Sequence, residues 1–175
     1  MLRPIAPLLA CLLLIGCAGG RVDLARMPAD MYAGQDLDDA VLLDLHRGFN
    51  ARAPLPSDPR AAAKLLAEVD YFAGEINAGG RWSDSPGIVQ TQMLQARGEV
   101  RAALGVAPGT TSQQLVDALL AVSRASDRAA QLAALSSPIF TLGAAGTLDR
   151  LSHLPPLPLT ETATGRAGVA DTSFD

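Results

Sequence analysis

The sequence predicts an all-α protein, a small antiparallel bundle of four to five helices. Three observations predict this fold class. Alanine and leucine are frequent in the 175 residues and runs of β-branched residues are rare, which favours helix. Apolar residues recur every three to four positions through the middle of the chain, as on one face of a helix. Most of these stretches begin with a capping residue, often followed by proline, as helices do.

The first two helices are expected at 37–49 and 59–76. Asp36 is a suitable N-cap for the first helix, and prolines follow its end. Its apolar residues recur every four positions: Leu37, Val41, Leu45 and Phe49. The second helix begins at Pro59 and ends before a glycine pair, because glycine adopts the left-handed cap conformation without penalty. Its charged residues are expected mostly on the outer face, Glu68 among them.

Three further helices are expected at 86–104, 111–135 and 138–151. The first and last of these open with a serine followed by proline, like many helices. Thr111 and Gln114 have the spacing of a capping box at the start of the helix expected at 111–135. A polar stretch inside this helix is expected to bend or break it. Short connections make neighbouring helices antiparallel, which gives a bundle.

The first sixteen residues have the parts of a secretory signal peptide. Arg3 supplies the positive charge, residues 5–15 the apolar run and Gly16 the small residue at the cut. The run is shorter than the about 20 apolar residues that span a membrane, and glycines and charges at 19–23 end it. We therefore expect residues 1–16 to be cleaved; an uncleaved membrane anchor is the alternative.

The four residues Leu14-Ile15-Gly16-Cys17 resemble the lipobox of bacterial lipoproteins. The resemblance implies a diacylglycerol on the Cys17 thiol, cleavage between Gly16 and Cys17, and acyl chains such as palmitate that hold the protein to a membrane. Two or three chains anchor a protein stably, whereas one does so only marginally. Ala18 replaces the aspartate that retains such proteins at the inner membrane, which implies an outer-membrane location facing the periplasm. In composition, the rest of the chain resembles small uncharacterised lipoproteins of Gram-negative bacteria, which adds no activity.

The remaining chain is expected to have three parts. Residues 17–29 contain glycines, a proline and mixed charges, and are expected to form a flexible, lipidated tether. Residues 30–153 are the helical bundle domain. Residues 154–175 are expected to be a proline-containing disordered tail, extended at first. The spacing of Pro155 and Pro158 also suits docking in an aromatic groove, although a spacer is the simpler interpretation.

Charge and cysteine content exclude several classes of function. Loss of Arg3 with the signal leaves 13 basic and 18 acidic residues, a net charge of −5, and no basic cluster that would bind nucleic acid. Cys11 leaves with the signal and Cys17 carries lipid, so the domain has no thiol for a disulfide, a metal or a nucleophile.

No catalytic residue, metal site or cofactor is predicted. His46 and His153 lie far apart in the sequence, and neither has a histidine or cysteine partner at ligand spacing. Lys64 lacks the serine three residues earlier that an acylating Ser-x-x-Lys pair needs. The chain is therefore expected to be a non-enzymatic structural or adaptor protein with an envelope protein as its partner.

Two alternatives from other classes stay open. The first is a carrier of a lipid or other apolar ligand, which requires a cavity lined by apolar side chains. The second is a carboxylate-based envelope hydrolase, with Glu68 and Asp70, or Glu75 and Asp84, as its acids. The hydrolase requires two carboxyl groups that face each other in a cleft, at least one of them with a raised pKa.

Arg81 and Trp82 form the remaining candidate site, in the loop after the second helix. Tryptophan and arginine are enriched at binding hot spots, so the pair is a candidate partner-binding anchor. The alternative is a lid on the end of the bundle, because tryptophan usually buries most of its surface.

Overall fold

The computed structural model describes residues 23–49 and 54–171, and these residues are all-helical. The predicted fold class is confirmed: the described residues form a helical bundle without a β-strand, and an isolated antiparallel bridge joins Val106 and Phe140. The α-helices are α1 (Leu37–Gly48), α2 (Pro59–Ala78), α3 (Gly87–Leu104), α4 (Ser112–Arg124), α5 (Arg128–Ala134), α6 (Gly143–Ser152) and α7 (Pro158–Asp171). Two 3-10 turns, η1 (Ala29–Tyr32) and η2 (Gly80–Trp82), precede α1 and α3.

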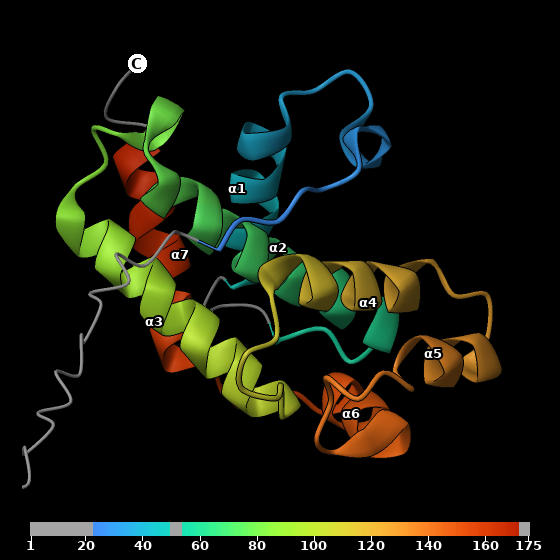
Figure 1. The fold of residues 1–175 in the computed structure, drawn as a ribbon. Coiled ribbons are helices and arrows are strands. Elements are labelled where there is room, and N and C mark those ends of the chain that lie inside the picture. The colour runs from blue at the N-terminus through green and yellow to red at the C-terminus, as the bar shows by residue number, and fades with distance from the viewer. Residues whose placement is uncertain (1–22, 50–53, 172–175) are drawn as a thin grey trace, which may run out of the picture.

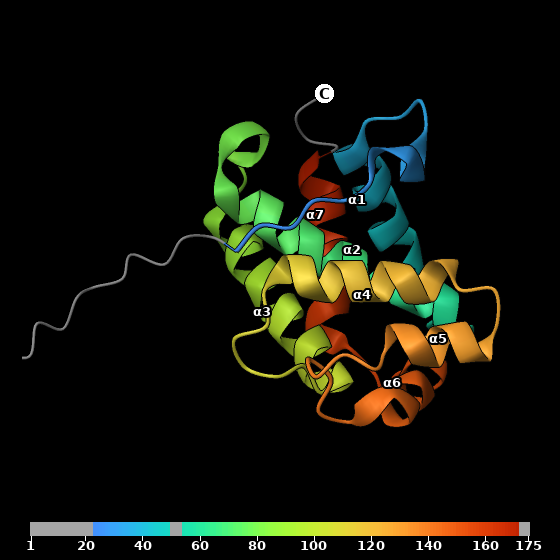
Figure 2. The ribbon, with the colours of Figure 1, turned by 45° about the vertical axis from the view of Figure 1, so that its right-hand side comes forward.

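Helix α2 lies at the centre of the bundle, in contact with α1, α3, α4 and α6 (Figures 1 and 2). Between Ala62 and Ile76 every residue except Lys64 and Glu75 is buried. A helix that is buried on all sides needs apolar or small residues around its whole circumference, and the alanines of α2 meet that need. The expectation that Glu68 points outward is wrong, because α1 and η1 cover that face of α2.

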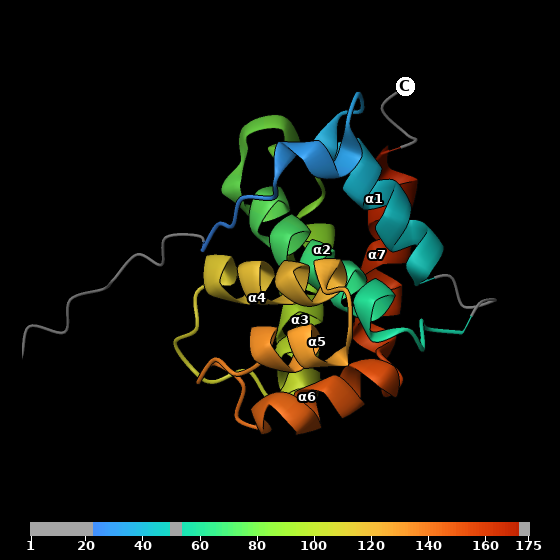
Figure 3. The ribbon, with the colours of Figure 1, turned by 90° about the vertical axis from the view of Figure 1, so that its right-hand side faces the viewer.

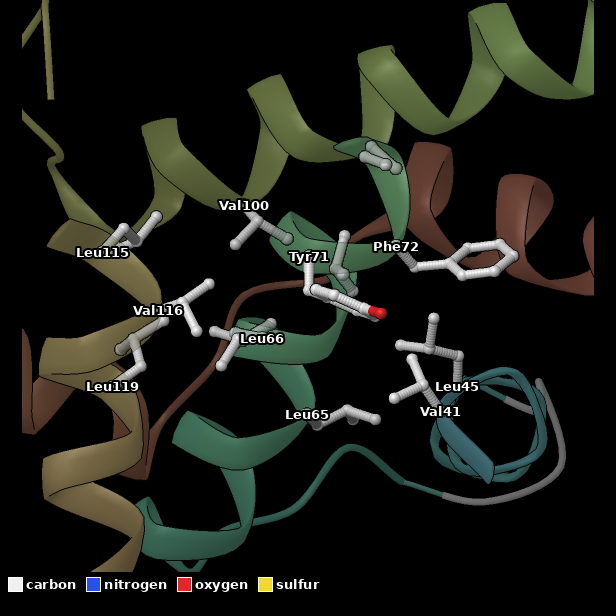
Figure 4. Packing of buried hydrophobic residues seen from close by; sticks show 14 of the residues in the cluster. Val41, Leu45, Leu65, Leu66, Tyr71, Phe72, Val100, Leu115, Val116 and Leu119 are labelled. Atoms are coloured by element: carbon white, nitrogen blue, oxygen red, sulfur yellow. The ribbon is translucent and has the colours of Figure 1, made fainter. Parts of the chain in front are cut away.

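The apolar core forms on two sides of α2 (Figure 4). On one side Leu66 meets Val100 of α3 and residues of α4 such as Leu119, and on the other Leu65 meets Leu45 of α1. Full burial of such a side chain stabilises the fold by about 1.5–3 kcal/mol.

The starts of α1, α2 and α4 follow the local signals in the sequence, whereas α3 begins at Gly87 without the expected side-chain cap from Ser85. The Asp36 side chain accepts hydrogen bonds from two backbone N–H groups of α1, and Asp58 caps α2 with Pro59 in its first turn. Thr111 and Gln114 form both bonds of the predicted capping box. The helix predicted at 111–135 breaks between α4 and α5, because the Asp127 side chain caps a new helix there.

Helix α6 also differs from its prediction. It was expected at 138–151 but begins at Gly143. The residues before it form a turn in which Phe140 is buried and Thr141 N–H donates to the Gly105 carbonyl after α3. These tertiary contacts hold the segment out of the helix.

As far as residue 171, the C-terminal segment is not the disordered tail that was expected at 154–175; residues 172–175 lie outside the described residues. Residues 158–171 form α7, which packs against α3 and α1 (Figure 3). Leu157, Ala163 and Ala167 are buried against these helices. The composition suggested disorder because the segment has few large apolar residues, but its small side chains let α7 approach its neighbours closely.

The expected tether at 17–29 is also wrong for its described part. Ala25 and Met27 are buried, and the backbone of Arg26 exchanges two hydrogen bonds with the Gln113 side chain of α4. Residues 23–28 are therefore part of the folded domain. The rest of the expected tether, and the expected signal peptide at 1–16, lie outside the described residues.

Candidate functional site

A pocket of about 320 Å³ opens between the end of α1 and the first half of α2. Asp44 and Arg47 of α1 and Lys64 and Glu68 of α2 supply its charged groups, and the neighbouring Pro56, Ala61 and Leu65 supply apolar surface. The two helices meet closely here: a Cβ atom on Gly48 would lie 2.5 Å from a Leu65 methyl carbon, so a larger residue at position 48 would force the Leu65 side chain to move.

Beside the pocket, four side chains form one hydrogen-bonded group, here called the Lys64 cluster: Tyr32, Asp44, Lys64 and Glu68. Lys64 Nζ donates to Asp44 Oδ2 at 2.5 Å, to Glu68 Oε1 at 2.5 Å and to the Tyr32 hydroxyl at 2.7 Å. An ammonium group has three N–H donors, so these three bonds use all of them. The Tyr32 hydroxyl also lies within hydrogen-bond distance of both carboxylates.

The cluster is electrostatically asymmetric. Burial raises the pKa of Glu68, although Lys64 and Tyr32 oppose this effect. Burial lowers the pKa of Lys64, but its hydrogen bonds and charge interactions with Asp44 and Glu68 outweigh burial and leave that pKa raised. Lys64 therefore stays an ammonium ion at neutral pH. Glu68 is fully buried, and its second oxygen, Oε2, has no hydrogen-bond partner in the described part of the chain.

This arrangement suits binding better than acid–base catalysis. A protonated lysine is not a nucleophile. Asp44 and Glu68 are two carboxyl groups at one pocket, and one has a raised pKa, as the hydrolase alternative requires. However, Lys64 Nζ lies between them, where a glycoside hydrolase would place its substrate.

Of the carboxylate pairs considered from the sequence, Glu68 and Asp70 do not share a site. Glu68 bonds to Lys64, whereas Asp70 bonds to arginines of α3 on another side of α2. Asp84 is exposed in the loop before α3, whereas Glu75 has a pKa raised by burial and by the charge of Asp38. The carrier alternative requires a cavity lined by apolar side chains, whereas this pocket combines apolar surface with four charged side chains.

Asp70 is the centre of a second polar network. It is fully buried, and its carboxylate accepts from Arg97, Arg101 and the Ser112 hydroxyl. Asp23 joins the network: its carbonyl accepts from Arg97 and its carboxylate from the Ser112 backbone N–H. The network ties α2, α3, α4 and the N-terminal segment together, so it has a structural role.

Trp82 is buried, with 8% of its surface exposed. Its ring packs edge-to-face on Phe72, with the ring centroids 5.1 Å apart, and its Nε1 donates to Asp38 at 3.3 Å. Arg81 lies over the tryptophan ring and pairs with Asp36 and Asp39 at the start of α1. These contacts favour the lid interpretation, and Trp82 offers little surface to a partner.

The two histidines do not meet. His46 is exposed on α1 beside Gly168 of α7, and His153 lies at the end of α6 near Asp149. Within 23–49 and 54–171, no group of three or more histidine, cysteine or acidic side chains is placed to hold a metal ion. None of the helices described is long and apolar enough to cross a membrane. Gly16 and Cys17 lie outside the described residues.

Sequence reasoning missed the Lys64 cluster. The one available signal was that Lys64 and Glu68 are four residues apart on a helix, the spacing of a helical ion pair. Tyr32 and Asp44 come from other elements, and only the packing of η1 and α1 on α2 brings them there.

Comparison of the chain with protein-family models, curated proteins and solved structures found no match.

Proposed function

We propose that this chain is a non-enzymatic lipoprotein of the bacterial envelope, held at the outer membrane by acyl chains on Cys17 and facing the periplasm. Its helical domain acts as a structural or adaptor protein that positions another envelope component. The observation that carries this proposal is the motif Leu14-Ile15-Gly16-Cys17, directly after Arg3 and an apolar run of signal-peptide length.

The fold supports a short distance between the domain and the membrane. Residues from Asp23 onward pack on α3 and α4, and Asp23 lies six residues after Cys17. Six residues span at most about 20 Å. A domain anchored at Cys17 therefore stays next to the bilayer, with the starts of α4 and the N-terminal segment on the side nearest the lipid.

The arrangement of the Lys64 cluster supports a role without catalysis. Its lysine is held as an ammonium ion between two carboxylates, and its tyrosine has a pKa raised by burial and by both acids. Neither group is therefore an activated nucleophile. These two properties favour binding over nucleophilic catalysis at the pocket.

Replacement of Cys17 by serine tests the anchor. In cells fed an acyl-chain probe, we expect Cys17→Ser to take up no label and to retain residues 1–16, because the thiol that accepts the lipid is gone. The matched control is Cys11→Ser, which removes the other cysteine of the chain and should leave labelling unchanged. Processed, labelled Cys17→Ser protein would contradict the proposal.

Crosslinking in cells tests the adaptor role. A photoreactive residue is placed at position 43 on α1 or position 88 on α3, where Leu43 and Ile88 are 44% and 54% exposed. We expect one of these positions to capture a single dominant envelope protein. Position 82 is buried and serves as the control. Capture of lipid alone, or of no protein at either exposed position, would contradict an adaptor role.

A further inference from the structure

The pocket beside the Lys64 cluster contains polar groups that the described residues leave unsatisfied. Glu68 Oε2 is buried without a hydrogen-bond partner. Asp44 accepts its bonds from Tyr32 and Lys64 through Oδ2, so its Oδ1 is open, and its side chain is one-third exposed. Arg47 is exposed and has no ion pair within the part of the chain that the structure describes.

These groups favour a ligand that carries a positive charge on one side. Asp44 and Glu68 bring two carboxylates to the pocket, and Lys64 balances one of them when both are ionised. A buried acceptor without a partner costs free energy, which a nearby donor with a positive charge would lower. A primary ammonium group is such a donor.

The same ligand would carry an anionic group. Lys64 cannot receive it, because all three of its N–H donors are already used. Arg47 can, since no described residue pairs with its guanidinium, which suits a carboxylate in a two-pronged contact. Asp44 and Arg47 are three residues apart on α1 and therefore lie on the same face of the helix.

We propose that this pocket binds a small zwitterion, an amino acid or short peptide, with its ammonium at Asp44 Oδ1 and its carboxylate at Arg47. A volume of about 320 Å³ is at the small end of the range for ligand pockets, which suits one or two residues of peptide. Pro56, Ala61 and Leu65 supply apolar surface for the rest of the ligand. The inference does not depend on whether Cys17 carries lipid.

The test uses the full chain in detergent and the dipeptide Ala-Ala, with binding measured by calorimetry. Two further probes each remove one charge: N-acetyl-Ala-Ala lacks the ammonium, and Ala-Ala amide lacks the carboxylate. We expect saturable binding of Ala-Ala and about tenfold or more weaker binding of each modified form, because each loses a charged hydrogen bond.

Variants assign each charge to its residue. Arg47→Gln should bind Ala-Ala and its amide equally, whereas Asp44→Asn should lose the preference for the free ammonium. Arg128→Gln, which changes an exposed arginine on α5, is the control and should behave as the wild type. Asp44→Asn also removes a hydrogen-bond partner of Lys64, so circular dichroism is used to check that this variant is folded. Arg47 is exposed, so Arg47→Gln tests the site without disturbing the Lys64 cluster.

Three outcomes would overturn the proposal. The first is no saturable binding of Ala-Ala, and the second is equal binding of all three probes to the wild type. The third is an Arg47→Gln variant that keeps the preference for the free carboxylate.

Discussion

Glu68 and Asp70 are neighbouring acids on α2 that are both fully buried, yet they are held differently. Both oxygens of Asp70 are bonded to arginine, and Ser112 adds a third donor. Glu68 bonds through one oxygen, and no described residue is a hydrogen-bond partner of the other. A fully paired acid supports the fold, whereas a buried oxygen without a partner costs free energy, so their substitutions should have different consequences.

The first prediction concerns Asp70→Asn. The variant keeps the shape of the side chain but removes its charge, which leaves Arg97 buried without a counter-ion. We expect the free energy of unfolding in urea to fall by about 3–5 kcal/mol. The control is Asp58→Asn, which changes a half-exposed ion pair and keeps a capping side chain, and should cost less than about 1 kcal/mol. Equal effects of the two variants would contradict the structural role of Asp70.

The second prediction is a pH dependence that Glu68 causes. Burial raises its pKa in the folded chain above the ordinary value of 4.5, so the folded state holds this proton over a pH range where the unfolded chain has lost it. Stability from this group is therefore present below pH 4.5 and is lost as the pH rises through the folded pKa. Lys64 stays charged throughout.

Urea unfolding between pH 4 and 8 measures this effect. The stability of the wild type relative to Glu68→Gln should fall as the pH rises above 4.5, and then level off. Glu161→Gln on α7, outside the cluster, is the control and should follow the wild type at every pH. If the stability of the wild type instead rises relative to that of Glu68→Gln over this pH range, the prediction is contradicted.

At the scale of elements, the starts of α1, α2 and α4 were predictable and the last helix was not. Asp36, Pro59 and the Thr111 capping box are local signals, so the sequence contains them in full. The start of α7 has its capping group on another helix: the Glu99 carboxylate of α3 accepts from the backbone N–H groups of Leu159 and Thr160. A local pattern cannot reveal a cap of that kind.

The third prediction follows from this contact. Glu99→Ala removes the cap of α7, so hydrogen exchange of the α7 amides should speed up, with a loss of about 1–2 kcal/mol in their protection. Exchange in α2 should change less, because α2 does not depend on Glu99. Gln95→Ala, an exposed substitution one turn earlier on α3, is the control. Unchanged exchange in α7 would show that packing alone holds this helix.

At the scale of the whole molecule, the N-terminal segment belongs to the domain. Its glycines, proline and charges suggested a tether, because composition does not reveal that the Arg26 backbone meets Gln113, 87 residues away. The Lys64 cluster was hidden for the same reason, since Tyr32 and Lys64 lie 32 residues apart. Long-range pairing of single polar groups leaves almost no pattern in one sequence, whereas helical periodicity repeats many times.

The fourth prediction tests this packing by proteolysis. Gln113→Ala removes both hydrogen bonds to the Arg26 backbone, so trypsin should cut after Arg26 several-fold faster than in the wild type. Gln95→Ala is again a suitable control, because Gln95 is exposed and lies on another helix. If trypsin cuts Gln113→Ala no faster than the wild type, these hydrogen bonds do not hold the N-terminal segment to the domain.

The most direct test of the proposed anchor is the mass of the N-terminal peptide from wild-type protein in the membrane fraction. The proposed function predicts a peptide that begins at Cys17 and carries a diacylglycerol on its thiol. A peptide that begins at Met1, or one that begins near Cys17 with a free thiol, would contradict a lipid-anchored protein.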